Sequence, residues 1–193
     1  AGTCIYPEIN LSADALDFGG VHVTETGDLV VTISNGGTSD LTVSDVAVTG
    51  DGYICDFGGE FVLGVGEAQD VIVTLDPDTY IDYPGLVTIT SDDPVNGTVT
   101  VDLTGLGLSQ DIELPLMALD FGEVVYGQSN ELTLYIVNLG NYDLTVTEMA
   151  VDFGEFVVEF DGGFVVDAET QITRTVTYTA DTYNTVEGNL TIT

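Results

Sequence analysis

Few side chains in this sequence could act as a nucleophile or as a general base. His22 is the only histidine, Arg174 is the only basic residue, and lysine is absent from the 193 residues. A catalytic serine or cysteine needs a base beside it, and no motif pairs either residue type with His22. We therefore expect His22 to have a structural role and the chain not to be an enzyme.

The two cysteines, Cys4 and Cys55, could instead form a disulfide. We expect an acidic, lysine-free sequence rich in β-forming residues to belong to an oxidising compartment, where disulfides persist. The sequence therefore favours a Cys4–Cys55 bridge within the chain. Free thiols and a bridge between subunits are the alternatives.

Carboxylates are abundant, with 33 Asp and Glu residues. Calcium is bound by several oxygen ligands from Asp, Asn and backbone carbonyls, and the stretches DPDTYID and SDDPVNG concentrate such oxygens in turns. Neither stretch matches an EF-hand loop, and a solvated acidic turn is the alternative interpretation. The candidate calcium ligands are Asp76, Asp78, Asp82, Asp92 and Asp93. No other cofactor is expected.

The net charge of −32 limits the partners of the chain. Phosphate backbones and anionic membranes attract cationic surfaces, so we expect no nucleic-acid partner and no attachment to an acidic membrane. No stretch approaches 18 consecutive apolar residues, so membrane insertion is not expected either. Such a charge also destabilises the fold by self-repulsion unless salt or bound cations screen it.

The elements that must position these residues are β-strands. Val, Ile, Thr, Tyr and Phe alternate with polar residues or form short apolar runs, as in residues 28–35 and 131–138. Asn-Gly pairs in SNGG (34–37) and VNGT (95–98) mark hairpin-type turns. About seven short strands per hundred residues, separated by turn signals, predict an all-β immunoglobulin-like sandwich.

The sequence contains two copies of one unit. ALDFGGV (15–21) returns as ALDFGEV (118–124), and DLTVSDVAV (40–48) returns as DLTVTEMAV (143–151). PDTY and GLVTIT return as ADTY and GNLTIT at the same offset of 103 residues, and 29 of 76 aligned positions are identical. Self-similarity of this extent indicates a duplicated domain.

The duplication defines two predicted domains. The first spans residues 1–107, with an N-terminal extension at 1–8, and the second spans residues 108–193. The linker between the copies, GLGLSQDIE, is short, so we predict two tandem sandwiches with limited freedom between them.

The repeated motifs resemble a known class of domains. ALDFGxV, xxxNxGxxDLTVxxxxV, VTLDP and GxVTITSDDP…VxLxGxG are similar to the ASPM-SPD-2-Hydin class of immunoglobulin-like domains. The closest variety is the tandem module of bacterial surface proteins called choice-of-anchor D. The resemblance covers nearly the whole chain and implies an extracellular, modular, non-enzymatic spacer or surface protein.

The second sandwich is expected to lack its last strand. Residues 188–193 correspond to residues 85–90, and the turn and strand at 91–107 have no counterpart. A sheet with an open edge exposes unpaired backbone groups and apolar side chains. The expected strand-acceptor edge consists of Leu190, Thr191, Ile192 and Thr193.

Two explanations fit an open edge. Either the chain is a piece of a longer array, or a neighbouring molecule supplies the strand by donor-strand complementation, which in a head-to-tail arrangement builds a filament. The only spare segment is N-terminal. Its candidate donor residues are Cys4, Ile5, Tyr6, Ile9 and Leu11.

Together these inferences predict a secreted or cell-surface structural protein that acts as a spacer, an adhesin stalk or a filament subunit. Its expected partners are copies of itself or adjacent modules of the same chain. The alternative function is a calcium- or carbohydrate-binding module of a larger secreted protein.

Overall fold

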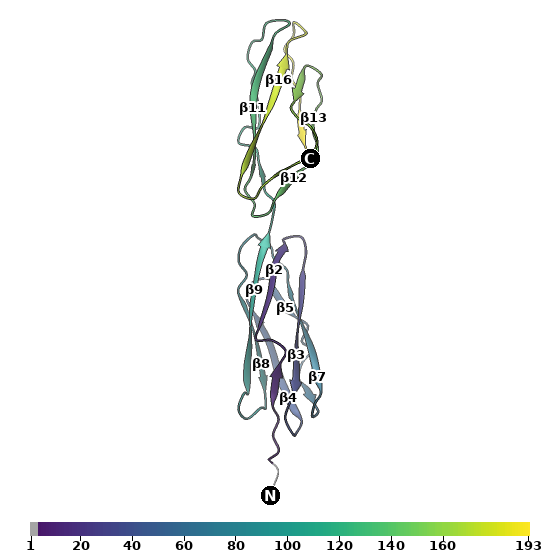
Figure 1. Cartoon of the computed structure of the whole chain (residues 1–193), viewed down its shortest axis with the longest axis vertical. Coiled ribbons are helices and arrows are strands. Elements are labelled where there is room, and N and C mark those ends of the chain that lie inside the picture. The colour runs from purple at the N-terminus through teal and green to yellow at the C-terminus, as the bar shows by residue number, and fades with distance from the viewer. Residues whose placement is uncertain (1–3) are drawn as a thin grey trace. The chain divides into compact units, whose positions relative to one another are not determined.

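The chain folds into two β-sandwich units. The computed structural model describes residues 4–193, which form strands and connecting loops (Figure 1). Unit 1 ends at Leu108 and unit 2 begins at Ser109. Each unit has its own core of buried apolar side chains, so the predicted fold class of two tandem all-β immunoglobulin-like domains is confirmed. No helix in this part of the chain is long and apolar enough to cross a membrane.

The first sheet of unit 1 has four strands, in the order β1-β3-β7-β5. These strands are β1 (Ile9–Leu11), β3 (Gly27–Asn35), β7 (Ala68–Leu75) and β5 (Tyr53–Cys55). All neighbours are antiparallel. Successive side chains of a strand point to opposite faces, so alternate apolar residues of β3 and β7 enter the core. The buried ones are Val31, Ile33, Val71, Val73 and Leu75.

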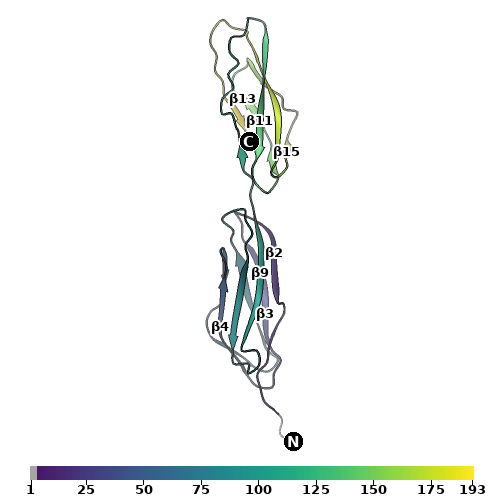
Figure 2. The same ribbon diagram turned by 90° about the vertical axis from the view of Figure 1, so that its left-hand side faces the viewer.

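The second sheet of unit 1 has five strands, in the order β2-β9-β8-β4-β6. They are β2 (Ala15–His22), β9 (Thr98–Leu108), β8 (Gly85–Ser91), β4 (Leu41–Thr49) and β6 (Phe61–Leu63). The long strand β9 is paired on both edges, antiparallel to β8 and parallel to β2. Figure 2 shows β2 and β9 side by side. Strand β9 therefore connects β2 to the rest of the sheet.

Unit 2 repeats the first sheet closely and the second only in part. Its four-stranded sheet has the order β10-β11-β16-β14. These strands are β10 (Ile112–Glu113), β11 (Ser129–Asn138), β16 (Gln171–Thr179) and β14 (Phe156–Val158). The second layer consists of two separate pairs, β12 with β15 and β13 with β17. Their bounds are β12 (Leu144–Val146), β15 (Phe164–Val166), β13 (Met149–Val151) and β17 (Leu190–Ile192).

One strand of unit 1 is divided in unit 2. Strand β4 passes an irregularity between Val43 and Asp45, where its pairing with β8 shifts by one residue. The corresponding Val146 and Glu148 lie at the break between β12 and β13. A bulge weakens the ladder locally. The long β8 keeps β4 continuous past it, whereas the short β17 pairs with β13 alone.

A buried asparagine closes the same end of both units. Asn35 is 1% exposed and Asn138 is fully buried. The side-chain amide of Asn35 donates to the carbonyls of Ser39 and Leu63 at 2.8 and 2.9 Å, and its oxygen accepts from the Gly37 amide at 2.9 Å. The equivalent partners of Asn138 are Tyr142, Val166 and Gly140. Each asparagine therefore links the turn after the long strand of the first sheet, β3 or β11, to the edge strand of the second sheet, β6 or β15.

The predicted Cys4–Cys55 disulfide is not formed. The Cys4 carbonyl accepts a hydrogen bond from Thr38, in the turn that follows β3. Cys55 aligns through β7 with Leu29, near the start of β3. The strand from Leu29 to Asn35 spans about 20 Å at the usual rise per residue, whereas a disulfide needs Cα atoms within about 7 Å. The prediction is wrong because the two cysteines lie toward opposite ends of the sandwich.

We expect Asn35→Ala to lower the free energy of unfolding of unit 1 by about 2–4 kcal/mol, because buried carbonyl and amide groups lose their partners. Urea unfolding followed by circular dichroism measures this change. The matched control is Asn96→Ala, at an exposed asparagine of the same unit, which should change the free energy by less than about 0.5 kcal/mol. Equal effects of the two substitutions would contradict the role assigned to Asn35.

Candidate strand-acceptor groove

The second sheet of unit 2 is open at the place where β9 lies in unit 1. The offset of the duplication makes β17 the counterpart of β8, and residues 118–125 the counterpart of β2. Within residues 4–193, β17 has β13 as its single partner strand, and residues 118–125 form no strand. Two segments that β9 would join are therefore left apart.

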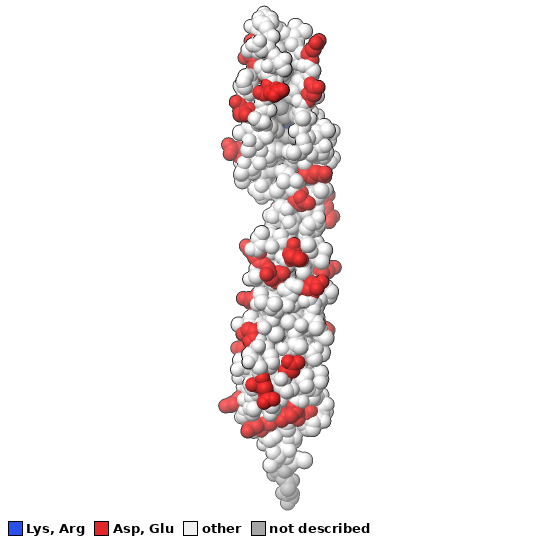
Figure 3. All heavy atoms as spheres, turned by 180° about the vertical axis from the view of Figure 1, so that it is seen from behind, with Lys and Arg blue, Asp and Glu red and all other residues white. Residues whose placement is uncertain are grey.

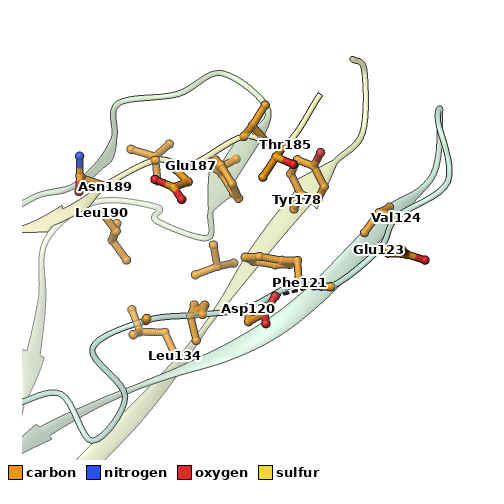
Figure 4. Close-up of a pocket in the computed structure, with 18 of the residues that line it drawn as sticks. Asp120, Phe121, Glu123, Val124, Leu134, Tyr178, Thr185, Glu187, Asn189 and Leu190 are labelled. Carbon is orange, nitrogen blue, oxygen red and sulfur yellow. Dashed lines mark hydrogen bonds between the residues drawn. The ribbon is translucent and has the colours of Figure 1, made fainter. Parts of the chain in front are cut away.

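A groove of about 1390 Å³ lies between these segments (Figure 4). Residues 116–126 and 182–190 contribute most of its lining, and Leu134, Val176 and Tyr178 of the first sheet line it as well. Figure 4 shows Phe121 and Leu134 on one side of the space, with Leu190 and Thr185 across from them. The groove thus lies between the counterparts of the two segments that flank β9 in unit 1.

Apolar side chains around the groove are less buried than their counterparts in unit 1. The buried residues of β2 and β8 are Leu16, Val21, Val87 and Ile89. The corresponding half-buried residues of unit 2 are Leu119, Val124, Leu190 and Ile192. Full burial of such a side chain contributes about 1.5–3 kcal/mol, so covering the groove would stabilise unit 2 by a part of that amount at each position.

Residues 118–124 keep the local shape of β2 without its pairing. The Gly122 amide donates to Asp120 Oδ1 at 2.9 Å, and Gly19 and Asp17 make the same bond in unit 1. The two glycines have φ angles of 64° and 59°, which glycine adopts without strain. The Asp-x-Gly turn is therefore set locally, whereas the strand around it forms only where β9 pairs with it.

Three aromatic rings form a cluster at the base of the groove. The centroids of Phe121, Phe156 and Tyr178 lie 5.0, 5.6 and 5.8 Å apart in pairs, within the favourable range for aromatic contacts. Their counterparts in unit 1 are Phe18, Tyr53 and Leu75. In unit 1, Gly105 of β9 lies directly against these three side chains.

The four residues predicted as the acceptor edge lie at β17. Residues 190–192 are the strand itself, and Thr193 exchanges backbone hydrogen bonds with Glu148 at 2.9 and 3.1 Å. The Asp152 carboxylate accepts from the backbone amide and the side chain of Asn189 at 2.6 and 2.8 Å, which fixes the start of β17. These bonds, the one from the Asn189 amide first, lower the pKa of Asp152.

The N-terminal segment is a strand of its own unit. Ile9 and Leu11 pair with β3, and Ile9 is buried in the core of unit 1. The Tyr6 amide donates to the Thr38 hydroxyl at 3.2 Å, and the Tyr6 carbonyl accepts from the Thr38 amide at 2.8 Å. The predicted donor residues Cys4, Ile5, Tyr6, Ile9 and Leu11 therefore lie in a segment bound to unit 1, and donating that segment would break these contacts.

The five predicted calcium ligands, all of them described residues, do not form one cluster. Asp78 accepts from the Tyr83 hydroxyl at 2.8 Å, and Asp92 accepts from the Thr42 amide at 2.8 Å. Asp76 follows the end of β7, and Asp82 forms an isolated bridge with Leu106. Within residues 4–193, no three His, Cys, Asp or Glu side chains are grouped so that they could hold a metal ion.

Asp93 instead fastens the β8–β9 hairpin to β1. It is 5% exposed, and its carboxylate accepts three backbone hydrogen bonds. The donors are the amides of Asn96, Val95 and Ile9, at 3.0, 2.8 and 2.9 Å. These bonds, that from Asn96 foremost, lower the pKa of Asp93. Its backbone partners give this carboxylate a structural role.

A buried carboxylate precedes Phe156 of the aromatic cluster. Glu155 is 5% exposed, and neither carboxylate oxygen has a hydrogen-bond partner in the described structure. The position is Gly52 in unit 1. The adjoining Asp181 carboxyl, with which a protonated Glu155 can share a hydrogen bond, raises the pKa of Glu155, and burial raises it further. Nothing in the local sequence marks Glu155 as buried, so only the structure shows its environment.

We expect Glu155→Gln to raise the thermal midpoint of unit 2 at about pH 7 and to leave it nearly unchanged at about pH 3.5. The folded state holds a proton on Glu155 at pH values where the unfolded state, with its ordinary pKa near 4.5, has released it. Stability therefore falls as the pH rises from about the unfolded pKa through the folded pKa, and it stays lower above that window.

Differential scanning calorimetry at the two pH values measures this effect. Glu159→Gln removes an exposed carboxylate close by and is the matched control, with little change expected at either pH. If Glu155→Gln raised the thermal midpoint of unit 2 as much at low pH as at neutral pH, the explanation by a raised pKa would be refuted.

Comparisons with solved structures give matches of low sequence identity. PapD-like domain 7 of human CEP192 matches with 13% identity and a TM-score of 0.46, over 57% of this chain and 92% of that one. The secreted serine protease VesC from Vibrio cholerae matches with 16% identity and a TM-score of 0.43, over 94% of this chain and 48% of that one. The class 5 fimbriae chaperone CfaA matches with 9% identity and a TM-score of 0.44, over 96% and 98%.

The duplicated sequence also matches a family model in both units. The model is described as the HYDIN/CFA65/VesB-like, Ig-like domain, and it matches residues 7–105 and residues 111–193. A search of curated proteins found no match. The matched ranges coincide with the two sandwiches, and they confirm the resemblance to ASPM-SPD-2-Hydin-like domains. The chain therefore belongs to the HYDIN/CFA65/VesB-like family of immunoglobulin-like domains, with one domain in each unit.

Proposed function

We propose that this chain is an extracellular structural protein whose modules are joined by strand complementation. Unit 2 takes into its groove an extended segment that is not one of its own strands. That segment comes from an adjacent module or from another copy of the chain. The protein then acts as a spacer, a stalk or a filament subunit, and no catalytic step is part of this role.

The observation that carries the proposal is the contrast between two nearly identical sequences. Residues 15–21 lie in β2, paired with β9, whereas residues 118–124 differ from them at one position and form no strand. Because six of the seven residues are identical, the difference in conformation follows the presence or absence of the partner strand. A strand placed in the groove would give residues 118–124 the pairing that β2 has.

The size and shape of the groove favour a strand over a small molecule. Its volume of about 1390 Å³ exceeds the roughly 300–1,000 Å³ of pockets for small ligands. It lies beside a sheet edge, where main-chain hydrogen bonds provide affinity and alternate side-chain sites provide specificity. Half-buried apolar residues on both sides supply those sites.

The charged surface supports a spacer role. Acidic side chains are scattered over each unit on the face shown in Figure 3. A strongly negative surface keeps protein molecules soluble and apart. Contacts through the half-buried apolar residues of the groove would then be attractive on a surface that otherwise repels copies of itself.

The proposal predicts that unit 2 is stabilised when a strand is appended to it. In an extended chain, a copy of residues 91–108 follows Thr193 directly, as Ser91 follows Thr90 in unit 1. A net gain of about 2 kcal/mol would raise the thermal midpoint of unit 2 by roughly 8–16 °C. Hydrogen exchange of residues 118–124 should slow at the same time, because their amides acquire partners.

A second extended chain provides the control. In it the copies of Val99, Val101 and Leu103, which face the core in unit 1, are replaced by aspartate, so that the appended strand has no apolar face. This chain should melt like the original one. If the first extension changes neither the midpoint nor the exchange of residues 118–124, the groove is not a strand acceptor.

A further inference from the structure

We propose that the groove selects a strand with glycine at one defined position, an inference that rests on the proposed function. The occupant is an extended polypeptide segment with the pattern of β9. It runs antiparallel to β17 and parallel to residues 118–125, as β9 runs against β8 and β2. Its first three inward positions are apolar, and its fourth inward position is glycine.

The inward pattern comes from β9 itself. Val99, Val101 and Leu103 point into the core of unit 1, and the residues between them are exposed. Val101 lies opposite Val87, and Val99 lies opposite Ile89. Val87 and Ile89 correspond to Leu190 and Ile192 of unit 2, which are half-buried and line the groove. Apolar residues at these positions of an incoming strand would therefore cover apolar residues of unit 2.

The glycine requirement comes from the aromatic cluster. A Cβ atom added to Gly105 in unit 1 would collide with Leu75, and it would lie 3.3 Å from the Tyr53 hydroxyl and 3.5 Å from Phe18 Cβ. In unit 2 these three positions hold Tyr178, Phe156 and Phe121. Tyr178 is larger than the leucine it replaces, and Phe156 keeps the ring of Tyr53 without its hydroxyl group. A side chain at the fourth inward position would be forced against three packed rings.

The next inward residue of β9 is not part of the proposal. Gly107 lies against Thr79 and Tyr83 in unit 1. Tyr83 corresponds to Val186 in unit 2, so this end of the groove is lined by a smaller side chain. The aromatic cluster is thus the feature that fixes which residue of an incoming strand sits at its centre, and it sets the register of the strand.

A synthetic peptide with the sequence of β9, TVTVDLTGLGL, tests this inference on the whole chain. The peptide has no aromatic residue, so a change in tyrosine fluorescence during a titration reports on the protein. We expect binding, with slower hydrogen exchange at residues 118–124. Residues 15–22 should not change, because β9 of the chain already occupies the equivalent place in unit 1.

Two peptide variants separate the inference from the proposed function. Gly105→Val should weaken binding about tenfold or more, since overpacking of this size is strongly unfavourable. Thr100→Val changes an exposed position of the strand and should bind within about twofold of the parent peptide. The same two substitutions in the appended copy of the extended chain give a second measurement, as loss or retention of the rise in thermal midpoint.

The outcomes are distinct. Weaker binding or a lower midpoint for Gly105→Val alone supports the glycine requirement. Equal behaviour of Gly105→Val, Thr100→Val and the parent overturns it and leaves strand complementation intact. Absence of any effect from both the parent peptide and the parent extension overturns the inference together with the proposed function.

Discussion

A strand inside a sheet needs hydrogen-bond partners on both edges, and the structure of each unit depends on whether that condition is met for β9. In unit 1, β9 joins β8 to β2 and supplies inward side chains to the core. A buried backbone group that is left without such a partner costs free energy comparable to a lost hydrogen bond. The shortened β17 and the irregular residues 118–125 of unit 2 both follow from this one condition.

The four-stranded sheet of each unit forms without any contribution from β9. Its four strands have the same order and nearly the same bounds in both units, because each strand finds its partner within the same sheet. The buried Asn35 and Asn138 fasten equivalent turns to the opposite sheet by the same bonds. Unit 2 therefore has one complete sheet and one incomplete sheet, and the aromatic cluster lies between them.

The fold accommodates its acidic residues in different ways. Asp93 and Asp152 accept several N–H hydrogen bonds, which favour the charged carboxylate and lower their pKa values. Glu155 lies beside the Asp181 carboxyl and is buried, and both conditions raise its pKa. The single cation of the chain, Arg174, lies 4.0 Å above the ring of Phe164, a cation–π contact. Most of the remaining carboxylates are exposed to water, where repulsion is weakest.

Sequence by itself determined the all-β class, the duplication, the turns and the alternate apolar positions, because each depends on residues close together in the chain. It also located β17 and the open edge by comparing one copy with the other. Only the tertiary structure decided that Cys4 and Cys55 lie far apart, that the N-terminal segment pairs within unit 1, and that the acidic turns form no cluster. The same holds for residues 118–124, whose sequence matches a strand and whose conformation does not. Strand formation depends on a partner distant in sequence, and no local pattern records whether that partner is present.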